Sequence, residues 1–197
     1  MKALILNSGL GFRMGVLTKE HPKCMTDISA TETILSRQLY LLQKAAVKDV
    51  VMTTGYFDDV LIKYCHSLNM RLNYTFVKNP VYDQTNYIYS IFCARKELRG
   101  EDIILLHGDL VFEFSVLQDM LASSSSCMKV SSTLPQPEKD FKAVVQNGFV
   151  KKVGVEFFGD DAMEAQALYK LNCQEWDMWL DKICEFVESG KNNVMQK

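Results

Sequence analysis

The sequence predicts an α/β protein whose mostly parallel central sheet carries a small antiparallel annex. Four stretches of strand length, apolar or alternating, are each followed by an amphipathic stretch of helix length between residues 4 and 121. This alternation is typical of parallel strands joined by right-handed crossover helices. Farther along, Asn147-Gly148 stands between two short apolar runs, as in a tight antiparallel hairpin. The two halves of the chain therefore differ in strand direction.

Each element follows from local periodicity and turn residues. Ser29 or Thr31 is expected to cap the first helix, and Pro80 is expected to end the third strand. In the first half, strands are expected at 4–6, 49–56 (strand, then turn), 72–77 and 102–107, and helices at 31–47, 58–69, 87–98 and 114–121. In the second half, strands are expected at 128–133, 143–145 and 149–153, and a helix at 173–187.

Composition indicates one soluble cytoplasmic domain. The chain has 197 residues, 48% of them hydrophobic, which suffices for one good core. A net charge of −2 makes nucleic acid and membrane surfaces poor partners. Six dispersed cysteines fit reduced thiols better than disulfides or a zinc site. No apolar run approaches the length of a membrane span.

The loop after the first strand, residues 7–11, is the first candidate site. Gly9 and Gly11 let the backbone approach a ligand closely, and successive amides in a turn favour anions. Arg13 and Lys23 bring two cations nearby, so a polyphosphate is the expected guest. A plain tight turn remains open as an alternative, because short glycine patterns often match by chance.

Three informative stretches follow predicted parallel strands: the glycine loop, residues 79–90 and residues 107–109. Ligands of open parallel sheets bind beyond the carboxyl ends of the strands, so these stretches are expected to converge. The loop is no P-loop, because no Gly-Lys-Ser/Thr closes it. It is also a poor dinucleotide fingerprint, since a polar run ending in Pro22 stands where a crossover helix should begin.

The combined motif is more specific than its parts. The order Gly9-x-Gly11-x-Arg13-Met14, then Leu17-Thr18-x-x-x-Pro22-Lys23, resembles the signature of the sugar and alkyl-phosphate nucleotidyltransferases. Asn7-Ser8 replaces the Ala-Ala pair common in that family. Further on, Asn79-Pro80-x-Tyr82-x-x-Thr85-Asn86 and Leu106-His107-Gly108-Asp109 resemble the branch that makes CDP-activated choline or aminoalkylphosphonates.

The resemblance spans the whole chain and implies a Rossmann-like, GT-A-like three-layer fold. It also implies transfer of a nucleotidyl group, with CTP the expected donor, to a small phosphate or phosphonate such as phosphocholine or 2-aminoethylphosphonate, with release of pyrophosphate. An anionic acceptor oxygen would attack the α-phosphorus, so no general base is needed. The protein would supply position and positive charge.

The resemblance also implies roles for individual residues. The nucleotide would be held by Asn7, Ser8, Gly9, Leu10 and Gly11. Arg13 would neutralise the β- and γ-phosphates, Lys23 would bridge the α-phosphate and the acceptor, and Asp109 would hold Mg²⁺. A solvated lysine and a turn-capping aspartate are the alternatives for the last two.

Other side chains have two open interpretations. Thr85 and Asn86 are natural helix caps and would also read the nucleobase. Glu156, Trp176 and Trp179 are the hypothesised site for a cationic head group. The alternative, that the tryptophans belong to the apolar stripe of their helix, is favoured by their spacing. His107 is interpreted as a strand-end histidine, since the reaction needs none.

The expected domain organisation is one nucleotidyltransferase domain, 1–197. Residues 1–110 would form the nucleotide-binding half, and 111–197 a truncated acceptor-binding half. The resemblance implies a second metal-binding carboxylate near the C-terminus that this sequence lacks, so activity is expected to be impaired unless a partner chain supplies it. A homo-oligomer stays open. The alternatives are a sugar-1-phosphate nucleotidyltransferase and a nucleotide-binding pseudoenzyme.

Overall fold

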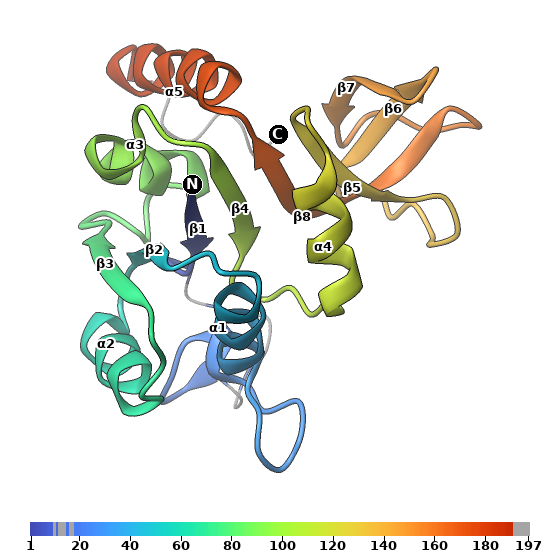
Figure 1. Cartoon of the computed structure of the whole chain (residues 1–197). Coiled ribbons are helices and arrows are strands. Elements are labelled where there is room, and N and C mark those ends of the chain that lie inside the picture. Colours follow the sequence, from blue (N-terminus) through green and yellow to red (C-terminus); the bar gives the residue numbers. More distant parts are fainter. Residues whose placement is uncertain (10, 12–14, 16–17, 191–197) are drawn as a thin grey trace.

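The computed structural model describes residues 1–9, 11, 15 and 18–190. Within them the predicted α/β fold is confirmed, and all eight strands belong to one sheet in the order β3-β2-β1-β4-β8-β6-β7, with β5 paired to β8 (Figure 1). The strands are β1 (Lys2–Leu6), β2 (Asp49–Thr54), β3 (Asn73–Lys78), β4 (Ile103–His107), β5 (Cys127–Ser131), β6 (Lys142–Gln146), β7 (Phe149–Gly154) and β8 (Ala162–Leu171).

The helices cover the sheet from both faces and complete three layers. They are η2 (Lys23–Met25, a single 3-10 turn), α1 (Ile34–Lys44), α2 (Asp58–Ser67), α3 (Tyr87–Leu98), α4 (Phe114–Ala122) and α5 (Cys173–Glu188). Buried side chains of α1, α2 and α4 share one core cluster, and those of α3 and α5 share the other. Successive side chains of a strand point to opposite faces, so each central strand serves both clusters.

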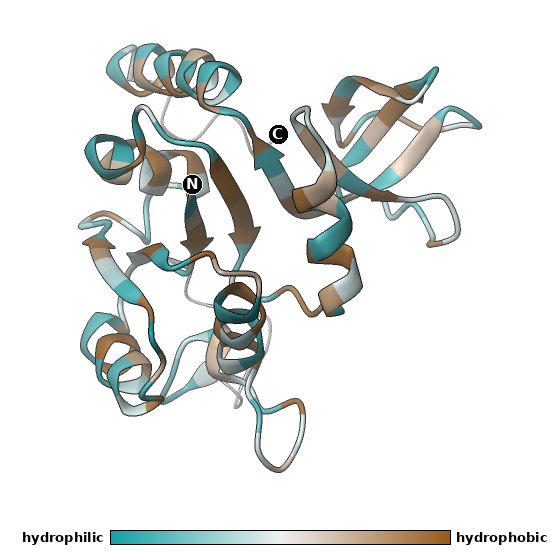
Figure 2. Ribbon diagram, in the orientation of Figure 1, coloured by the Kyte–Doolittle hydropathy of each residue, from teal (hydrophilic) through white to brown (hydrophobic). Residues whose placement is uncertain are grey.

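The nucleotide-binding half predicted from sequence is a parallel sheet. Strands β2 and β4 flank β1 in parallel, with Leu6 opposite Thr53 on one side and His107 on the other. All three strands therefore end at the same level. Figure 2 shows β1 and β4 as almost entirely hydrophobic strands, as expected where helices cover both faces.

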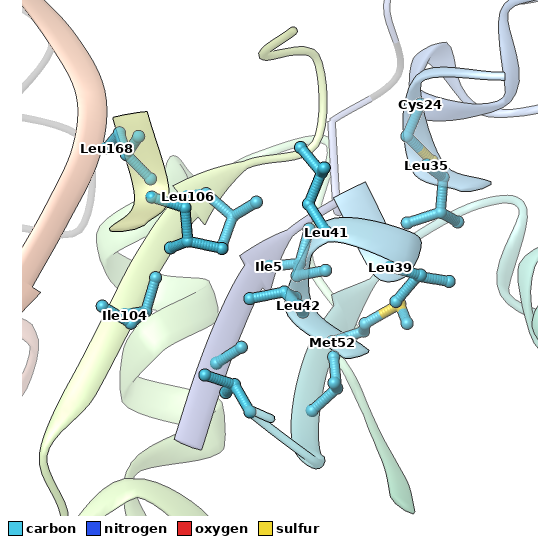
Figure 3. Packing of buried hydrophobic residues seen from close by; sticks show 14 of the residues in the cluster. Ile5, Cys24, Leu35, Leu39, Leu41, Leu42, Met52, Ile104, Leu106 and Leu168 are labelled. Carbon is cyan, nitrogen blue, oxygen red and sulfur yellow. The ribbon is translucent and has the colours of Figure 1, made fainter. Parts of the chain in front are cut away.

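The first core cluster lies between α1 and the sheet. Figure 3 shows Leu39 and Leu42 of α1 packing with Ile5 of β1 and Met52 of β2. All four side chains have no exposed surface. This packing fixes α1 beneath the ends of the central strands, which matters for the site described below.

Strand β8 was not predicted from the sequence. Its segment, AMEAQALYKL, is rich in helix-forming residues, and no local pattern marks it as a strand. It forms because it pairs antiparallel with β4 through Leu105 and Tyr169, and also with β5 and β6. The antiparallel annex is thus continuous with the parallel sheet, because tertiary pairing overrides local propensity.

Two local predictions have different outcomes. Helix α1 begins three residues later than expected, because Thr33 caps it in a reciprocal capping box with Ser36, so the predicted caps Ser29 and Thr31 were wrong. The hairpin turn between β6 and β7 is confirmed. Asn147 and Gly148 both have positive φ (54° and 78°), as a type I′ turn requires.

Among the helices of the described part, none has the length and apolar character needed to cross a bilayer.

Candidate active site

A cavity of about 500 Å³ opens where the parallel strands end. It is lined by residues of the loop after β1, by Pro22 to Cys24, by the segment from Asn79 to Ser90, and by His107 to Asp109. The three stretches expected to converge do so, because β1, β3 and β4 deliver them to the same edge of the sheet. The loop and η2 then bring Lys23 over this edge.

Lys23 and Asp109 form an ion pair at the cavity. Lys23 Nζ donates to Asp109 Oδ2 at 2.5 Å, and the two side chains are 37% and 41% exposed. Burial alone would raise the pKa of Asp109, but the hydrogen bond and the charge of Lys23 outweigh it, so the pKa lies below its ordinary value. The carboxylate is therefore ionised at neutral pH and available to a cation.

The loop after β1 is packed tightly against its neighbours. The Asn7 N–H donates to the Thr53 carbonyl at 3.2 Å, and the Asn7 side chain lies across Gly108. A Cβ at position 108 would sit 1.6 Å from Asn7 Oδ1, so any larger residue there would displace the Asn7 side chain. Asn7 Nδ2 and Ser8 Oγ are buried and lack a hydrogen-bond partner within the described structure. Both residues line the cavity.

The segment after β3 is organised by Asn79. Its Nδ2 donates to Thr85 Oγ1 (3.0 Å) and Ser90 Oγ (3.1 Å), and its Oδ1 accepts the Val81 N–H (3.0 Å). Thr85 also donates to the Val81 carbonyl at 2.8 Å. Thr85 thus shapes the loop with its hydroxyl.

Asn86 is the N-cap of α3, as predicted. Its Oδ1 accepts the Ile88 N–H at 2.9 Å, which fixes the orientation of the amide. Its Nδ2 is then directed away from the helix, and this atom is buried without a partner in the described part of the chain. The side chain is 5% exposed and lines the cavity. Asn86 is therefore part of the cavity wall, with its amide nitrogen buried in that wall.

His107 ends β4 beside Tyr87, with ring centroids 5.4 Å apart. Burial lowers the pKa of His107 and raises that of Tyr87, so both are neutral near pH 7. Both line the cavity. From the sequence alone, no role is assigned to Tyr82, Tyr87 or Cys24. The available signal was that the two tyrosines lie in the segment after β3 and that Cys24 follows Lys23.

Trp176 is a core residue. Trp176 has no exposed surface, and its Nε1 donates to the Leu98 carbonyl at 3.0 Å, which joins α5 to α3. Trp179 packs edge-on against it, with centroids 5.5 Å apart. The hypothesis of a head-group site at Trp176 was therefore wrong, and the core-stripe interpretation holds for it. Neither residue lines the cavity.

Glu156 lies apart from the cavity, in the annex. Its carboxylate covers Gly154, where a Cβ would meet Oε2 at 2.4 Å. The neighbouring aromatic rings make cation–π contacts with lysines of the same chain. Lys142 Nζ lies 4.1 Å from the Phe158 ring centroid, and Lys152 Nζ lies 5.7 Å from the Phe157 ring centroid. Both rings next to Glu156 in the sequence thus already lie against cations of this chain.

Arg13 and Leu10 lie outside the described residues. Gly9 and Gly11 line the cavity, and Gly11 has a φ of +66°, a conformation that favours glycine. Asp109 is the one carboxylate among the described lining residues. Correspondingly, no group of three or more potential metal ligands occurs in the described ranges.

A glycine loop, a lysine and an aspartate at the carboxyl edge of a parallel sheet define an α/β protein that handles phosphates. The chain belongs to the MobA-like NTP transferase domain family, whose model matches residues 3–143. The family resemblance inferred from the motifs is thereby confirmed.

Individual relatives are cytidylyltransferases and related enzymes. The chain is 27% identical to the CTP:phosphoglutamine cytidylyltransferase of Campylobacter jejuni, over 99% of this chain and 81% of that protein. It is 31% identical to the CMP-5'-(3-aminopropyl)phosphonate synthase of Streptomyces rubellomurinus, over 68% of this chain but only 21% of that protein.

The fold is also that of a solved cytidylyltransferase. The CTP:phosphocholine cytidylyltransferase of Streptococcus pneumoniae superposes with a TM-score of 0.72 at 17% identity, over 99% of this chain and 81% of that one. At this identity the likeness establishes the fold alone. It confirms the Rossmann-like, GT-A-like arrangement expected from the motifs.

Proposed function

We propose that this protein transfers a cytidylyl group from CTP to a small phosphate or phosphonate acceptor and releases pyrophosphate. The observation that carries the proposal is the single cavity in which the glycine loop, Lys23, Asn86 and Asp109 meet. The cytidylyltransferases among its relatives support CTP as the donor. Phosphocholine, 2-aminoethylphosphonate and an amino-acid phosphate are the candidate acceptors.

The chemistry needs position and charge rather than a base. An acceptor oxygen, already anionic, forms a bond to the α-phosphorus while the bond to the bridging oxygen breaks, and pyrophosphate leaves with that electron pair. Lys23 stabilises the charge that builds on the α-phosphate, and the loop amides of residues 8–11 hold the polyphosphate. The acceptor oxygen is already anionic and loses no proton. The reaction therefore needs no general base, and His107 can stay neutral.

Asn86 and the loop present donors to the nucleotide. The three unpartnered groups of the cavity wall, on Asn7, Ser8 and Asn86, can each donate a hydrogen bond. Cytosine offers adjacent acceptors, O2 and N3, whereas the corresponding edges of uracil and guanine include N–H donors. A donor on Asn86 would match one of these acceptors, while the choice of CTP rests on the relatives.

Asp109 fits a magnesium ion that the nucleotide largely holds. Mg²⁺ takes one or two protein carboxylates and keeps phosphate oxygens and waters as its other ligands. When bound, it would neutralise charge on the polyphosphate. With one lining carboxylate in the described structure, we expect metal affinity to limit turnover. The dispersed free cysteines support a reducing cytoplasm as the location.

A pyrophosphate-release screen tests the proposal. Each of four nucleoside triphosphates is incubated with Mg²⁺ and one acceptor. The acceptors are phosphocholine, 2-aminoethylphosphonate, phosphoglutamine and several sugar-1-phosphates. The expected result is release with CTP and one of the first three acceptors. Turnover only with a sugar phosphate would instead identify a sugar nucleotidyltransferase. CTP binding without release under every condition would identify a nucleotide-binding protein without catalysis.

A further inference from the structure

The turn that carries Asp109 accepts two hydrogen bonds from one buried side-chain amide. Gln38, on α1, is 1% exposed. Its Nε2 donates to the His107 carbonyl at 2.9 Å and to the Leu110 carbonyl at 2.7 Å. These two carbonyls bracket Gly108 and Asp109, so a single side chain spans the turn.

The same turn is tied at its other side and along its exit. The Gly108 N–H donates to the Leu6 carbonyl at 3.1 Å, which anchors the turn to β1. The Leu110 N–H donates to the His107 carbonyl at 3.2 Å. Arg37, next to Gln38 on α1, donates through Nε to the Phe112 carbonyl at 3.2 Å. The backbone around Asp109 is thus fixed to both a strand and a helix.

The polar side chain of Gln38 lies in apolar surroundings. Leu35, Leu39 and Leu42 of the same helix are completely buried in the core cluster. Gln38 Oε1 is buried and has no hydrogen-bond partner in the described structure. Buried unpaired acceptors are unfavourable. A leucine at this position would remove the unpaired acceptor. It would also remove the donor to the His107 and Leu110 carbonyls, so these two hydrogen bonds are what the glutamine contributes.

We propose that Gln38 is a positioning residue that fixes the turn from His107 to Leu110 and thereby aims the Asp109 carboxylate at the divalent ion accompanying the nucleotide. This inference rests on the proposed function. Gln38 touches neither nucleotide nor metal; it acts through the backbone that carries Asp109. Groups behind a metal ligand commonly change metal affinity by 10- to 100-fold when removed, because small displacements of the ligand weaken its bond.

The test compares Gln38→Leu with a matched control on the same helix, Gln43→Leu. Gln43 also makes a side-chain bond to backbone, its Oε1 accepting the Arg71 N–H at 2.6 Å, but it does not line the cavity. Binding of Mn²⁺ to the protein in the presence of CTP is measured by electron paramagnetic resonance, with Mn²⁺ standing in for Mg²⁺. Gln38→Leu is expected to weaken Mn²⁺ binding by about tenfold, and Gln43→Leu to leave it unchanged.

A double-mutant cycle separates positioning from a general loss of structure. In an Asp109→Ala background, Gln38→Leu is expected to have no further effect on Mn²⁺ binding, because its action passes through that carboxylate. If Gln38→Leu does not fold, Gln38→Met, which keeps the length of the side chain and removes both donors, replaces it in the cycle.

Two outcomes would overturn the inference. The first is a folded Gln38 variant that binds Mn²⁺ within twofold of the wild type, and the second is an equal loss in Gln43→Leu. A wild-type chain that binds no Mn²⁺ in the presence of CTP would overturn the proposed function, and this inference with it. Normal wild-type binding with an unaffected Gln38 variant overturns the inference alone.

Discussion

Lys23 Nζ and Asp109 Oδ2 lie 2.5 Å apart, although 86 residues separate them in the chain. In the proposed reaction Lys23 stabilises charge on the phosphates and Asp109 binds the metal ion. In the structure the two opposite charges pair with each other at the cavity. Binding of the anionic nucleotide with its cation would give each side chain a new partner, so we expect the pair to separate as the site fills.

Replacing Asn86 with aspartate isolates its role toward the nucleotide. Aspartate is an equally good N-cap, so α3 should keep its start. The donor Nδ2, however, becomes an acceptor within the cavity wall. We expect the Kd for CTP to rise by about tenfold, because one buried hydrogen bond is worth on the order of 1 kcal/mol and a repulsion replaces it. Calorimetric titration measures the Kd, and thermal unfolding checks the cap. An unchanged Kd would remove Asn86 from the nucleotide site.

The burial of His107 makes stability depend on pH. Its pKa in the folded protein lies below its ordinary value of 6.5, so below that pH the unfolded chain binds more protons than the folded chain. The free energy of unfolding should therefore fall as the pH is lowered through 6.5 toward the folded pKa. Urea unfolding from pH 5 to 8 measures this dependence. His107→Gln should flatten it, and identical slopes in both proteins would contradict the assignment.

Cys24 should be chemically protected in the folded protein. It is 1% exposed next to Lys23, and burial raises the pKa of its thiol, so little reactive thiolate forms. Labelling with a thiol reagent at pH 8, followed by peptide mass analysis, should modify the half-buried Cys127 well before Cys24. Equal labelling rates at Cys24 and Cys127 would show that the structure around Cys24 opens readily.

Trp176 should matter for stability and not for the acceptor. Trp176→Phe removes the bond to Leu98 and part of the packing between α3 and α5. We expect it to lower the free energy of unfolding by roughly 1–3 kcal/mol. The KM for the acceptor, measured at saturating CTP, should stay within twofold of the wild type. A selective rise in that KM with normal stability would restore the head-group hypothesis.

Local sequence signals predicted the parallel half well. Strands β1 to β4 are short apolar or alternating runs, and each following helix shows its own periodicity, so the convergence of the glycine loop, Asn86 and Asp109 followed from topology. Strand β8 escaped prediction because its helix-forming residues become a strand only through three distant pairing partners. The hydrophobic pattern could not separate a core tryptophan from a binding one.

Gln38 could not be found from sequence for a related reason. Its two hydrogen bonds reach carbonyls 69 and 72 residues away. On an amphipathic helix, a glutamine is ordinarily a solvent-facing residue. Only the packing of α1 beneath the strand ends reveals that this one faces inward.

The most direct test of the account is the turnover of Lys23→Ala, measured as pyrophosphate release with CTP and the acceptor that the screen identifies. Lys19→Ala, at an exposed lysine four residues away, is the matched control. We expect Lys23→Ala to lower kcat on the order of a hundredfold or more, as for other preorganised charges, and Lys19→Ala to leave it unchanged. A Lys23→Ala protein with normal turnover would contradict the assignment of this cavity as the catalytic site.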